Sequence, residues 1–147
     1  MMVFTDDHFM KEAYKQAEKA EKEGEVPIGC VITIQNQLIA KAYNQVERLH
    51  DATAHAEMLA ITAAEHYLGS KYLDQCTLYV TLEPCLMCAS ACSWTQLGKL
   101  VIGAGDPQRG YSILYPSALH AKTVVVKNVY QEPCQHLITN FFKKIRK

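Results

Sequence analysis

Two cysteines and one histidine have the spacing of a catalytic zinc site. The stretch 81–88 reads TLEPCLMC, so Cys85 and Cys88 lie three positions apart behind a proline. His55 stands 30 residues before Cys85. A catalytic zinc needs three protein ligands and one open position for water, and one imidazole with two thiolates is an accepted ligand set. The sequence therefore predicts one Zn²⁺ per chain, held by His55, Cys85 and Cys88, with a bound water or hydroxide.

Glu57 follows His55 by two positions and brings a carboxylate to the same site. Side chains two positions apart on a helix do not point along the same line, so Glu57 need not be a ligand. In the same turn it can still reach a water on the metal, whose pKa zinc lowers from 15.7 toward ~7. Glu57 is therefore the candidate catalytic residue, a carboxylate that moves protons between water and substrate.

Other readings of the cysteines are weaker. A bare Cys-x-x-Cys pair also occurs in structural zinc knuckles and redox sites, but the sequence offers no second ligand pair, and His55 brings Glu57 with it. Cys92 follows Cys88 by one helical turn and could approach the metal, yet a fourth protein ligand would close the position that water needs. We expect Cys92 to be a buried thiol. Core burial is also expected for Cys30, Cys76 and Cys134.

The residues of the zinc site are predicted at the starts of two helices. From Ala54 to Leu68 the sequence is rich in good helix formers, which places His55 and Glu57 in the first turn. Pro84 is expected to open a second helix, which begins with the two cysteines and ends at Gly98. Partial positive charge at two facing helix starts would favour the ionised thiolates that bind a metal.

Strands and further helices must position these two starts. Apolar residues at helical spacing indicate an N-terminal helix that ends at Gly24 and a C-terminal amphipathic helix that runs through Ile145. The alternation of strands and helices predicts a layered α/β domain over residues 1–147, with helices on both faces of one sheet. The expected strands are 28–34, 38–43, 76–80, 99–103 and 123–127, and the first two form a hairpin.

Two connecting segments stand out from this pattern. The polar segment 44–51 leaves the sheet after the hairpin. The segment 104–122 is a long loop between the last two strands, and loops of this length are usually functional or disordered.

Charge gives no reason to favour or exclude a polyanionic partner. The 147 residues contain 15 Lys plus Arg and 15 Asp plus Glu, and the length suits one domain with an ordinary core. Four of the positive charges lie in the final stretch KKIRK, residues 143–147. This local basic patch could touch phosphates or could simply be a solvated helix end.

The sequence lacks the features of an exported or membrane protein. Its six cysteines have neither the density nor the export signal of a disulfide scaffold. Asp6 and Asp7 stand where a signal peptide needs a basic segment, and no apolar run approaches the ~18 residues that span a bilayer. We therefore expect a cytoplasmic protein with no membrane partner.

These motifs give the chain a family resemblance. It resembles the cytidine and deoxycytidylate deaminase superfamily, and most closely the bacterial tRNA-specific adenosine deaminases. Besides the His-x-Glu and Pro-Cys-x-x-Cys motifs, the resemblance rests on EVPIG at 25–29, on DATAHAE at 51–57 and on TLYVTLEPC at 77–85. Asn44 and the terminal Phe141–Phe142 with its basic neighbours also match. The resemblance covers nearly the whole chain.

The resemblance implies a fold, an assembly and a reaction. The implied fold is a three-layer α/β/α cytidine deaminase-like fold with a central five-stranded mixed sheet, and the implied assembly is a homodimer. The implied reaction is zinc-dependent hydrolytic deamination of adenosine to inosine at the wobble position of tRNA. An anticodon loop suits this chemistry because it presents unstacked bases. No DNA partner is expected.

The same resemblance implies three substrate-binding residues. Asn44 would hydrogen-bond the target base, the backbone N–H of Ala56 would meet the base edge on the zinc side, and the backbone around Glu83 would face the amino group. For Asn44 the alternative is a turn residue that caps the loop.

The sequence departs from this family after Asp106. Relatives commonly have a short segment with Lys and Gly or Ser, whereas this chain has PQRGYSILYP at 107–116, and the helix after Cys88 lacks an arginine often found near its end. In this loop Arg109 and Tyr111 could pair a cation with a stacking platform, or could belong to a plain surface loop. The alternative function is a deaminase of free guanine, cytosine or cytidine. A non-catalytic zinc-stabilised RNA-binding or subunit protein is disfavoured because Glu57 is present.

Overall fold

One five-stranded mixed sheet runs through the computed structural model, which describes residues 3–145. The strand order is β2-β1-β3-β4-β5. β1 pairs antiparallel with both β2 and β3, whereas β3, β4 and β5 run parallel. The sheet expected from the sequence is confirmed. The strands are β1 (Gly29–Ile34), β2 (Gln37–Tyr43), β3 (Cys76–Leu82), β4 (Lys99–Ala104) and β5 (Val124–Val126).

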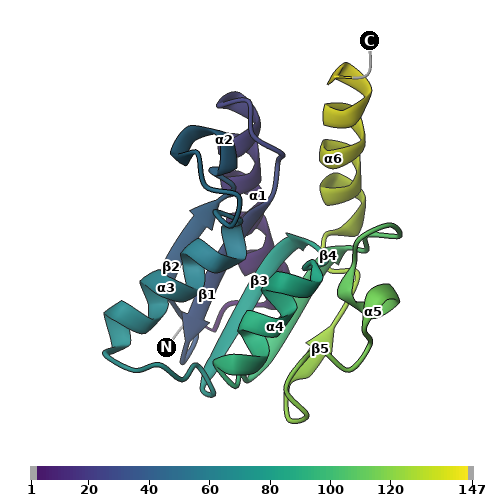
Figure 1. The fold of residues 1–147 in the computed structure, drawn as a ribbon. Coiled ribbons are helices and arrows are strands. Elements are labelled where there is room, and N and C mark those ends of the chain that lie inside the picture. Colours follow the sequence, from purple (N-terminus) through teal and green to yellow (C-terminus); the bar gives the residue numbers. More distant parts are fainter. Residues whose placement is uncertain (1–2, 146–147) are drawn as a thin grey trace.

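Helices cover both faces of the sheet and complete the expected α/β/α layers (Figure 1). On one face lie α1 (Asp6–Lys22) and α6 (Gln131–Ile145), and on the other lie α3 (Ala56–Leu68) and α4 (Leu86–Trp94). The short helices α2 (Val46–Leu49) and α5 (Tyr111–Leu114) lie in the connecting segments. No helix in residues 3–145 is both long enough and apolar enough to cross a bilayer.

The two layers of core follow from the alternation of side chains along β3. Leu78 and Val80 belong to the cluster formed with α3 and α4, while Tyr79 belongs to the cluster formed with α1. The hydroxyl of Tyr79 donates to Asp6 at 2.8 Å, and Lys99 pairs with the same carboxylate at 3.0 Å. The start of α1 is thereby fixed to the centre of the sheet.

Both helices at the predicted zinc site begin later than the sequence suggested. α3 begins at Ala56, so His55 is its N-cap residue and not part of its first turn. α4 begins at Leu86 with Cys85 as the N-cap, so Pro84 precedes the helix. His55 and Cys85 both have extended backbone dihedrals, as N-cap residues do. The two proposed ligands therefore lie at the helix ends, where unpaired backbone N–H groups accumulate.

The predicted end of α4 at Gly98 was wrong. The helix ends at Trp94, because Gln96 takes a positive φ of 56° and the backbone N–H groups of Gln96 and Leu97 turn back to the carbonyls of Ser93 and Cys92. Gly98 serves a different purpose. A Cβ at Gly98 would overlap the carbonyl oxygen of Asp74, so the glycine lets the chain pass close to β3 as it enters β4.

The two connecting segments are more regular than the sequence indicated. The segment 44–51 contains α2, and the long loop 104–122 is folded and contains α5. The expected burial of the cysteines outside the zinc motif is confirmed, and none of the six forms a disulfide. The buried thiols are Cys30, Cys76, Cys92 and Cys134.

Candidate metal and catalytic site

The structure brings His55, Cys85 and Cys88 together where the N-terminal ends of α3 and α4 meet. The Nδ1 atom of His55 lies 3.6 Å from the Sγ atom of Cys85 and 3.5 Å from that of Cys88. All three ligand atoms lie within 4.8 Å of one another. Typical Zn–N and Zn–S bond lengths place the nitrogen and sulfur ligands of a tetrahedral zinc about 3.6 Å apart. The donor set therefore fits a zinc ion.

The charges of the thiols are coupled through hydrogen bonds. The hydrogen bond from the Cys88 side chain, followed by the hydrogen bond from His55, lowers the pKa of Cys85 to about 4, although burial acts in the opposite direction. The shared hydrogen bond raises the pKa of Cys88. The bond to Cys85 raises the pKa of His55 as well. Cys85 is thus a thiolate at neutral pH, and a cation among the three residues would take the place of the shared protons.

Glu57 lies in the first turn of α3 with only 3% of its surface exposed. Burial raises the pKa of Glu57 to about 7. Within residues 3–145, its Oε1 atom is the one buried side-chain nitrogen or oxygen atom without a hydrogen-bond partner. A buried carboxylate oxygen without a partner indicates a missing polar group. A water on a zinc held by the three ligand residues would supply it, so Glu57 also fits the predicted site.

Asn44 lies next to the start of α3. Its Oδ1 atom accepts a hydrogen bond from the backbone N–H of Ala56 at 2.8 Å, and both residues are buried. Asn44 therefore caps α3 from outside the helix, which is a different structural contact from the loop cap considered as its alternative. None of the described residues accepts a hydrogen bond from its Nδ2 atom. Binding of a base by Asn44 stays a prediction.

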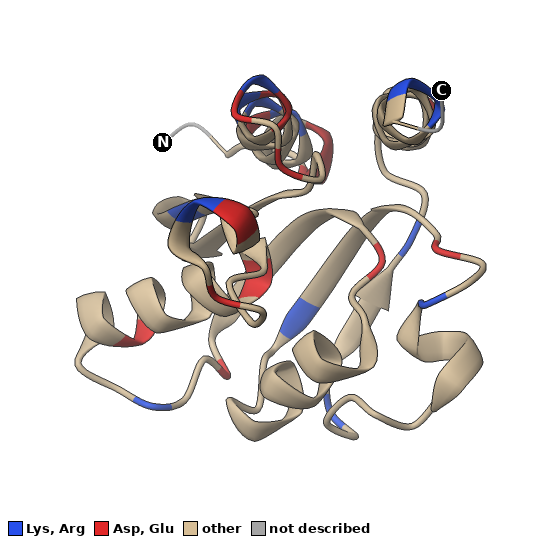
Figure 2. Cartoon of the chain, turned by 45° about the horizontal axis from the view of Figure 1, so that its top comes forward, with Lys and Arg blue, Asp and Glu red and all other residues tan. Residues whose placement is uncertain are grey.

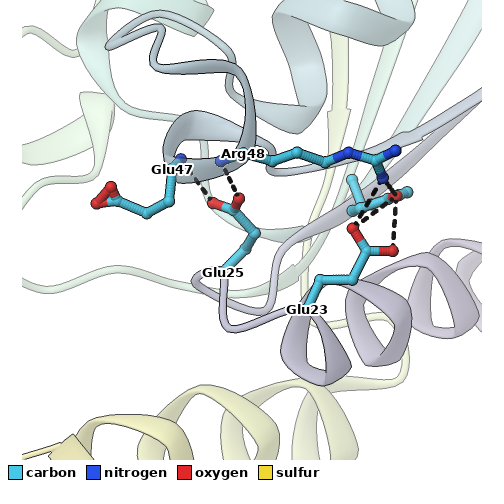
Figure 3. Close-up of polar contacts among 5 residues, drawn as sticks. Glu23, Glu25, Glu47 and Arg48 are labelled. Atoms are coloured by element: carbon cyan, nitrogen blue, oxygen red, sulfur yellow. Dashed lines mark hydrogen bonds and ion pairs between the residues drawn. The ribbon is translucent and has the colours of Figure 1, made fainter.

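A buried carboxylate that the sequence did not identify, Glu25, holds the segment that follows Asn44. Glu25 accepts hydrogen bonds from the backbone N–H groups of Glu47 and Arg48, at 3.1 and 2.8 Å, and so caps α2 (Figure 3). Nearby, Glu23 accepts bonds from Arg48 at 3.1 Å and from the Tyr43 hydroxyl at 2.9 Å. These contacts connect the end of α1 to the segment that follows Asn44. The EVPIG block carries no sequence signal that this glutamate is buried.

The loop after β4 lies against the segment that carries the cysteines. Glu83 is buried, and its side chain turns toward the backbone of Asp106 and Ser112. Tyr111 is only 4% exposed and packs into the core cluster of α3 and α4, so the hypothesis of a stacking platform at Tyr111 was wrong. Arg109 is exposed and remains available to a ligand.

Comparison with known proteins identifies the family. Residues 4–104 match the family model described as the cytidine and deoxycytidylate deaminase zinc-binding region. The matched range contains the three proposed ligand residues and Glu57, so the class of protein is a zinc-dependent deaminase. The chain belongs to the cytidine and deoxycytidylate deaminase family.

Proteins similar to this chain are named for different substrates. The chain is 44% identical to the tRNA-specific adenosine deaminase of Bacillus subtilis (strain 168), over 97% of this chain and 91% of that protein. A solved structure from a study of A-to-I editing by tRNA:A34 deaminases at the wobble position of transfer RNA has a TM-score of 0.82 and 37% identity, over 88% of this chain and 98% of the other. The structure of guanine deaminase from Bacillus subtilis has a TM-score of 0.68 and 32% identity, over 77% and 76%.

Proposed function

We propose that this protein deaminates adenosine to inosine at the wobble position of a tRNA by zinc-dependent hydrolysis. The observation that carries the reaction class is the meeting of three zinc-binding side chains with the buried, unpartnered Oε1 atom of Glu57. The substrate is supported by the 44% identity to a tRNA-specific adenosine deaminase over almost the entire chain.

Each residue of the site has a distinct part in this reaction. His55, Cys85 and Cys88 would hold one zinc ion, which when bound supplies Lewis acidity and so makes hydroxide available at neutral pH. Glu57 would take a proton from the water whose oxygen bonds to the ring carbon bearing the amino group, and would deliver that proton to a ring nitrogen of the base. It would then take the proton of the newly added hydroxyl group and pass it to the amino group, which departs as ammonia as the C–N bond breaks. Because Glu57 is enclosed by protein, it exchanges protons with the substrate and not with bulk water.

Substrate binding is assigned to the residues on either side of the zinc ligands. Asn44 would donate its Nδ2 hydrogens to the base, because its Oδ1 atom already accepts from Ala56. The backbone around Glu83 would face the amino group. The Ala56 backbone N–H already donates to Asn44 Oδ1, so it would have to give up that bond to meet the base edge on the zinc side. The basic patch near the C-terminus would contact phosphates. Its last two residues, Arg146 and Lys147, lie outside the described residues.

The substrate can be tested with a panel. Purified zinc-loaded protein is incubated with an anticodon stem-loop that carries adenosine at the wobble position, and separately with free guanine, cytosine, cytidine and adenosine. Ammonia release and the bases of the digested RNA are measured by coupled assay and mass spectrometry. We expect inosine from the RNA and no turnover of the small molecules.

A free-base deaminase is the second candidate, favoured by the 32% identity to guanine deaminase. Consumption of guanine with unchanged RNA would establish it. In that case the segment 104–122 would close the pocket over a small substrate and would not contact RNA.

We also propose that the protein is a homodimer that associates through α4 and α5. Both helices lack charged residues and are coloured tan throughout in Figure 2. Trp94 at the end of α4 is 83% exposed, and a groove of about 500 Å³ beside it is uncharged. The groove is lined by apolar residues and serines, namely Leu86, Ser90, Ser93, Trp94, Tyr115, Ser117 and Ala118. Large uncharged apolar patches on soluble proteins usually mark an interface. A second copy of the same chain would bury this face by a two-fold contact.

Sedimentation of two variants tests the dimer. Trp94→Glu places a charge in the centre of the proposed contact and should produce monomers. Tyr67→Glu changes another exposed aromatic residue, which lies on α3, and should leave the assembly unchanged. A Trp94→Glu variant that sediments like the parent protein contradicts this interface.

For the remaining context, we propose one deaminase domain over residues 1–147 and a cytoplasmic location. Six free cysteines, two of them proposed zinc ligands, suit a reducing compartment, and tRNA is found in the cytoplasm.

A further inference from the structure

The carboxylate of Glu83 is held by the segment Asp106–Ser112. Its Oε1 atom accepts the backbone N–H of Asp106 at 3.1 Å, and its Oε2 atom accepts the backbone N–H of Ser112 at 3.0 Å. The hydroxyl of Ser112 donates to Oε2 as well. Glu83 is 8% exposed, and within residues 3–145 it forms no ion pair. The charge of this buried carboxylate is therefore balanced by hydrogen-bond donors of one segment.

The same segment lies directly along the cysteine motif. Gly110 forms an antiparallel bridge with Cys85, and the N–H of Tyr111 donates to the carbonyl of Pro84 at 3.0 Å. A Cβ at Gly110 would overlap the Glu83 carboxylate, so the close approach requires glycine at this position. Tyr111 then anchors the end of the segment in the core. The segment Asp106–Ser112 is thus fixed next to a proposed zinc ligand.

A nucleotide that enters the zinc site must rest its backbone on the surface around that site, because only the target base is extruded into the pocket. The segment Asp106–Ser112 borders Cys85 and carries the exposed Arg109, so it is part of that surface. Resting on the proposed tRNA deamination, we infer that Glu83 is a positioning residue that holds this segment as one wall of the substrate site. Its side chain acts on substrate binding through the segment, without touching the base.

A substitution that keeps the shape of Glu83 tests this role. In Glu83→Gln one carboxylate oxygen becomes an amide nitrogen, which cannot accept the N–H or O–H groups that point at it. One or two of the three hydrogen bonds are lost. Loss of one such bond corresponds to about a tenfold change in an equilibrium constant.

Hydrogen exchange of the zinc-loaded protein measures the segment without any substrate. We expect peptides that cover 106–112 to exchange about tenfold faster in Glu83→Gln, while peptides from α3 stay unchanged. Zinc content should equal that of the parent protein. KM should rise about tenfold, with a much smaller change in kcat. Glu18→Gln removes an exposed carboxylate from α1 and should change none of these quantities.

A milder variant removes one hydrogen-bond donor and keeps the charge of Glu83. Ser112→Ala keeps the Glu83 carboxylate and removes only the hydroxyl donor, so we expect a smaller increase of exchange in the same peptides and a smaller increase of KM. Unchanged hydrogen exchange at 106–112 in Glu83→Gln overturns the inference, and so does faster exchange that extends equally to α3.

KM is measured on whichever substrate the parent protein deaminates. A wrong substrate assignment therefore appears in the parent protein, and a wrong role for Glu83 appears only in the variants.

Discussion

The Nδ1 atom of His55 lies 3.6 Å from the Sγ atom of Cys85, although the two residues are 30 positions apart. The contact exists because α3 and α4 lie side by side on one face of the sheet, with their N-terminal ends at the same edge (Figure 1). His55 caps one helix and Cys85 caps the other. A metal bound here is therefore a link between two helix starts as well as a reagent.

Removal of the imidazole should remove the metal. We predict that His55→Ala loses most of its zinc and all measurable deamination, because two cysteines alone leave the tetrahedral set incomplete. Metal analysis by mass spectrometry of dialysed protein measures the zinc content. His66→Ala, an exposed histidine in the last turn of the same helix, is the control and should keep its zinc. Full zinc content in His55→Ala would show that His55 is not a ligand.

Removal of the shuttle carboxylate should separate metal binding from catalysis. We predict that Glu57→Gln keeps its zinc but loses at least ~10²–10⁴-fold in kcat, the usual contribution of a positioned acid or base. Its melting temperature should not fall, because the charge removed is a buried carboxylate with an unpartnered oxygen. Glu65→Gln, on the same helix, should retain full activity. An active Glu57→Gln enzyme would disprove the assigned role.

Two substitutions at Asn44 should separate its structural contact from its proposed contact with the base. Asn44→Ala leaves the Ala56 N–H without its acceptor, and we expect a loss of about 1 kcal/mol in the free energy of unfolding. Asn44→Asp keeps an acceptor for that N–H, so it should retain stability while losing the Nδ2 donor and most of kcat/KM. Urea unfolding and steady-state kinetics give the two readouts. Parental kinetics in Asn44→Asp would exclude Asn44 from substrate recognition.

The buried carboxylate of Glu25 should matter far more for stability than its neighbour Glu23. Glu25→Ala removes both acceptors that cap α2, and we expect the free energy of unfolding to fall by about 2–3 kcal/mol. Glu23→Ala breaks the partly exposed pair with Arg48 and should cause a much smaller loss. Urea titrations of both variants test this order, and equal losses would contradict it.

Much of the fold and of the zinc site could be predicted from the sequence, because the signals are local. The apolar run at β3, the helix formers after Ala56 and the spacing of Cys85 and Cys88 each act over a few residues. The α/β/α order of layers follows from the alternation of these elements. The proposed ligand set could be predicted because each of its residue types has a specific chemistry with zinc.

The contacts that position the walls of the site could not be predicted in this way. Glu25 and Glu83 each accept backbone N–H groups from segments that lie 22 to 29 positions further along the chain. A carboxylate that accepts hydrogen bonds from backbone N–H groups leaves no pattern of residue types in the sequence, since almost any residue can provide the N–H. For the same reason the sequence predicts only a loop over 104–122, whereas tertiary contacts fold this segment around Glu83 and Tyr111.

The most direct test of the proposed reaction is site-resolved sequencing of one RNA. An anticodon stem-loop with adenosine at the wobble position and at two other loop positions is incubated with zinc-loaded protein, and each position is read for conversion to inosine. We predict conversion at the wobble position alone, and none with Glu57→Gln. An RNA with every adenosine intact, under conditions in which the same protein releases ammonia from free guanine, would contradict the account.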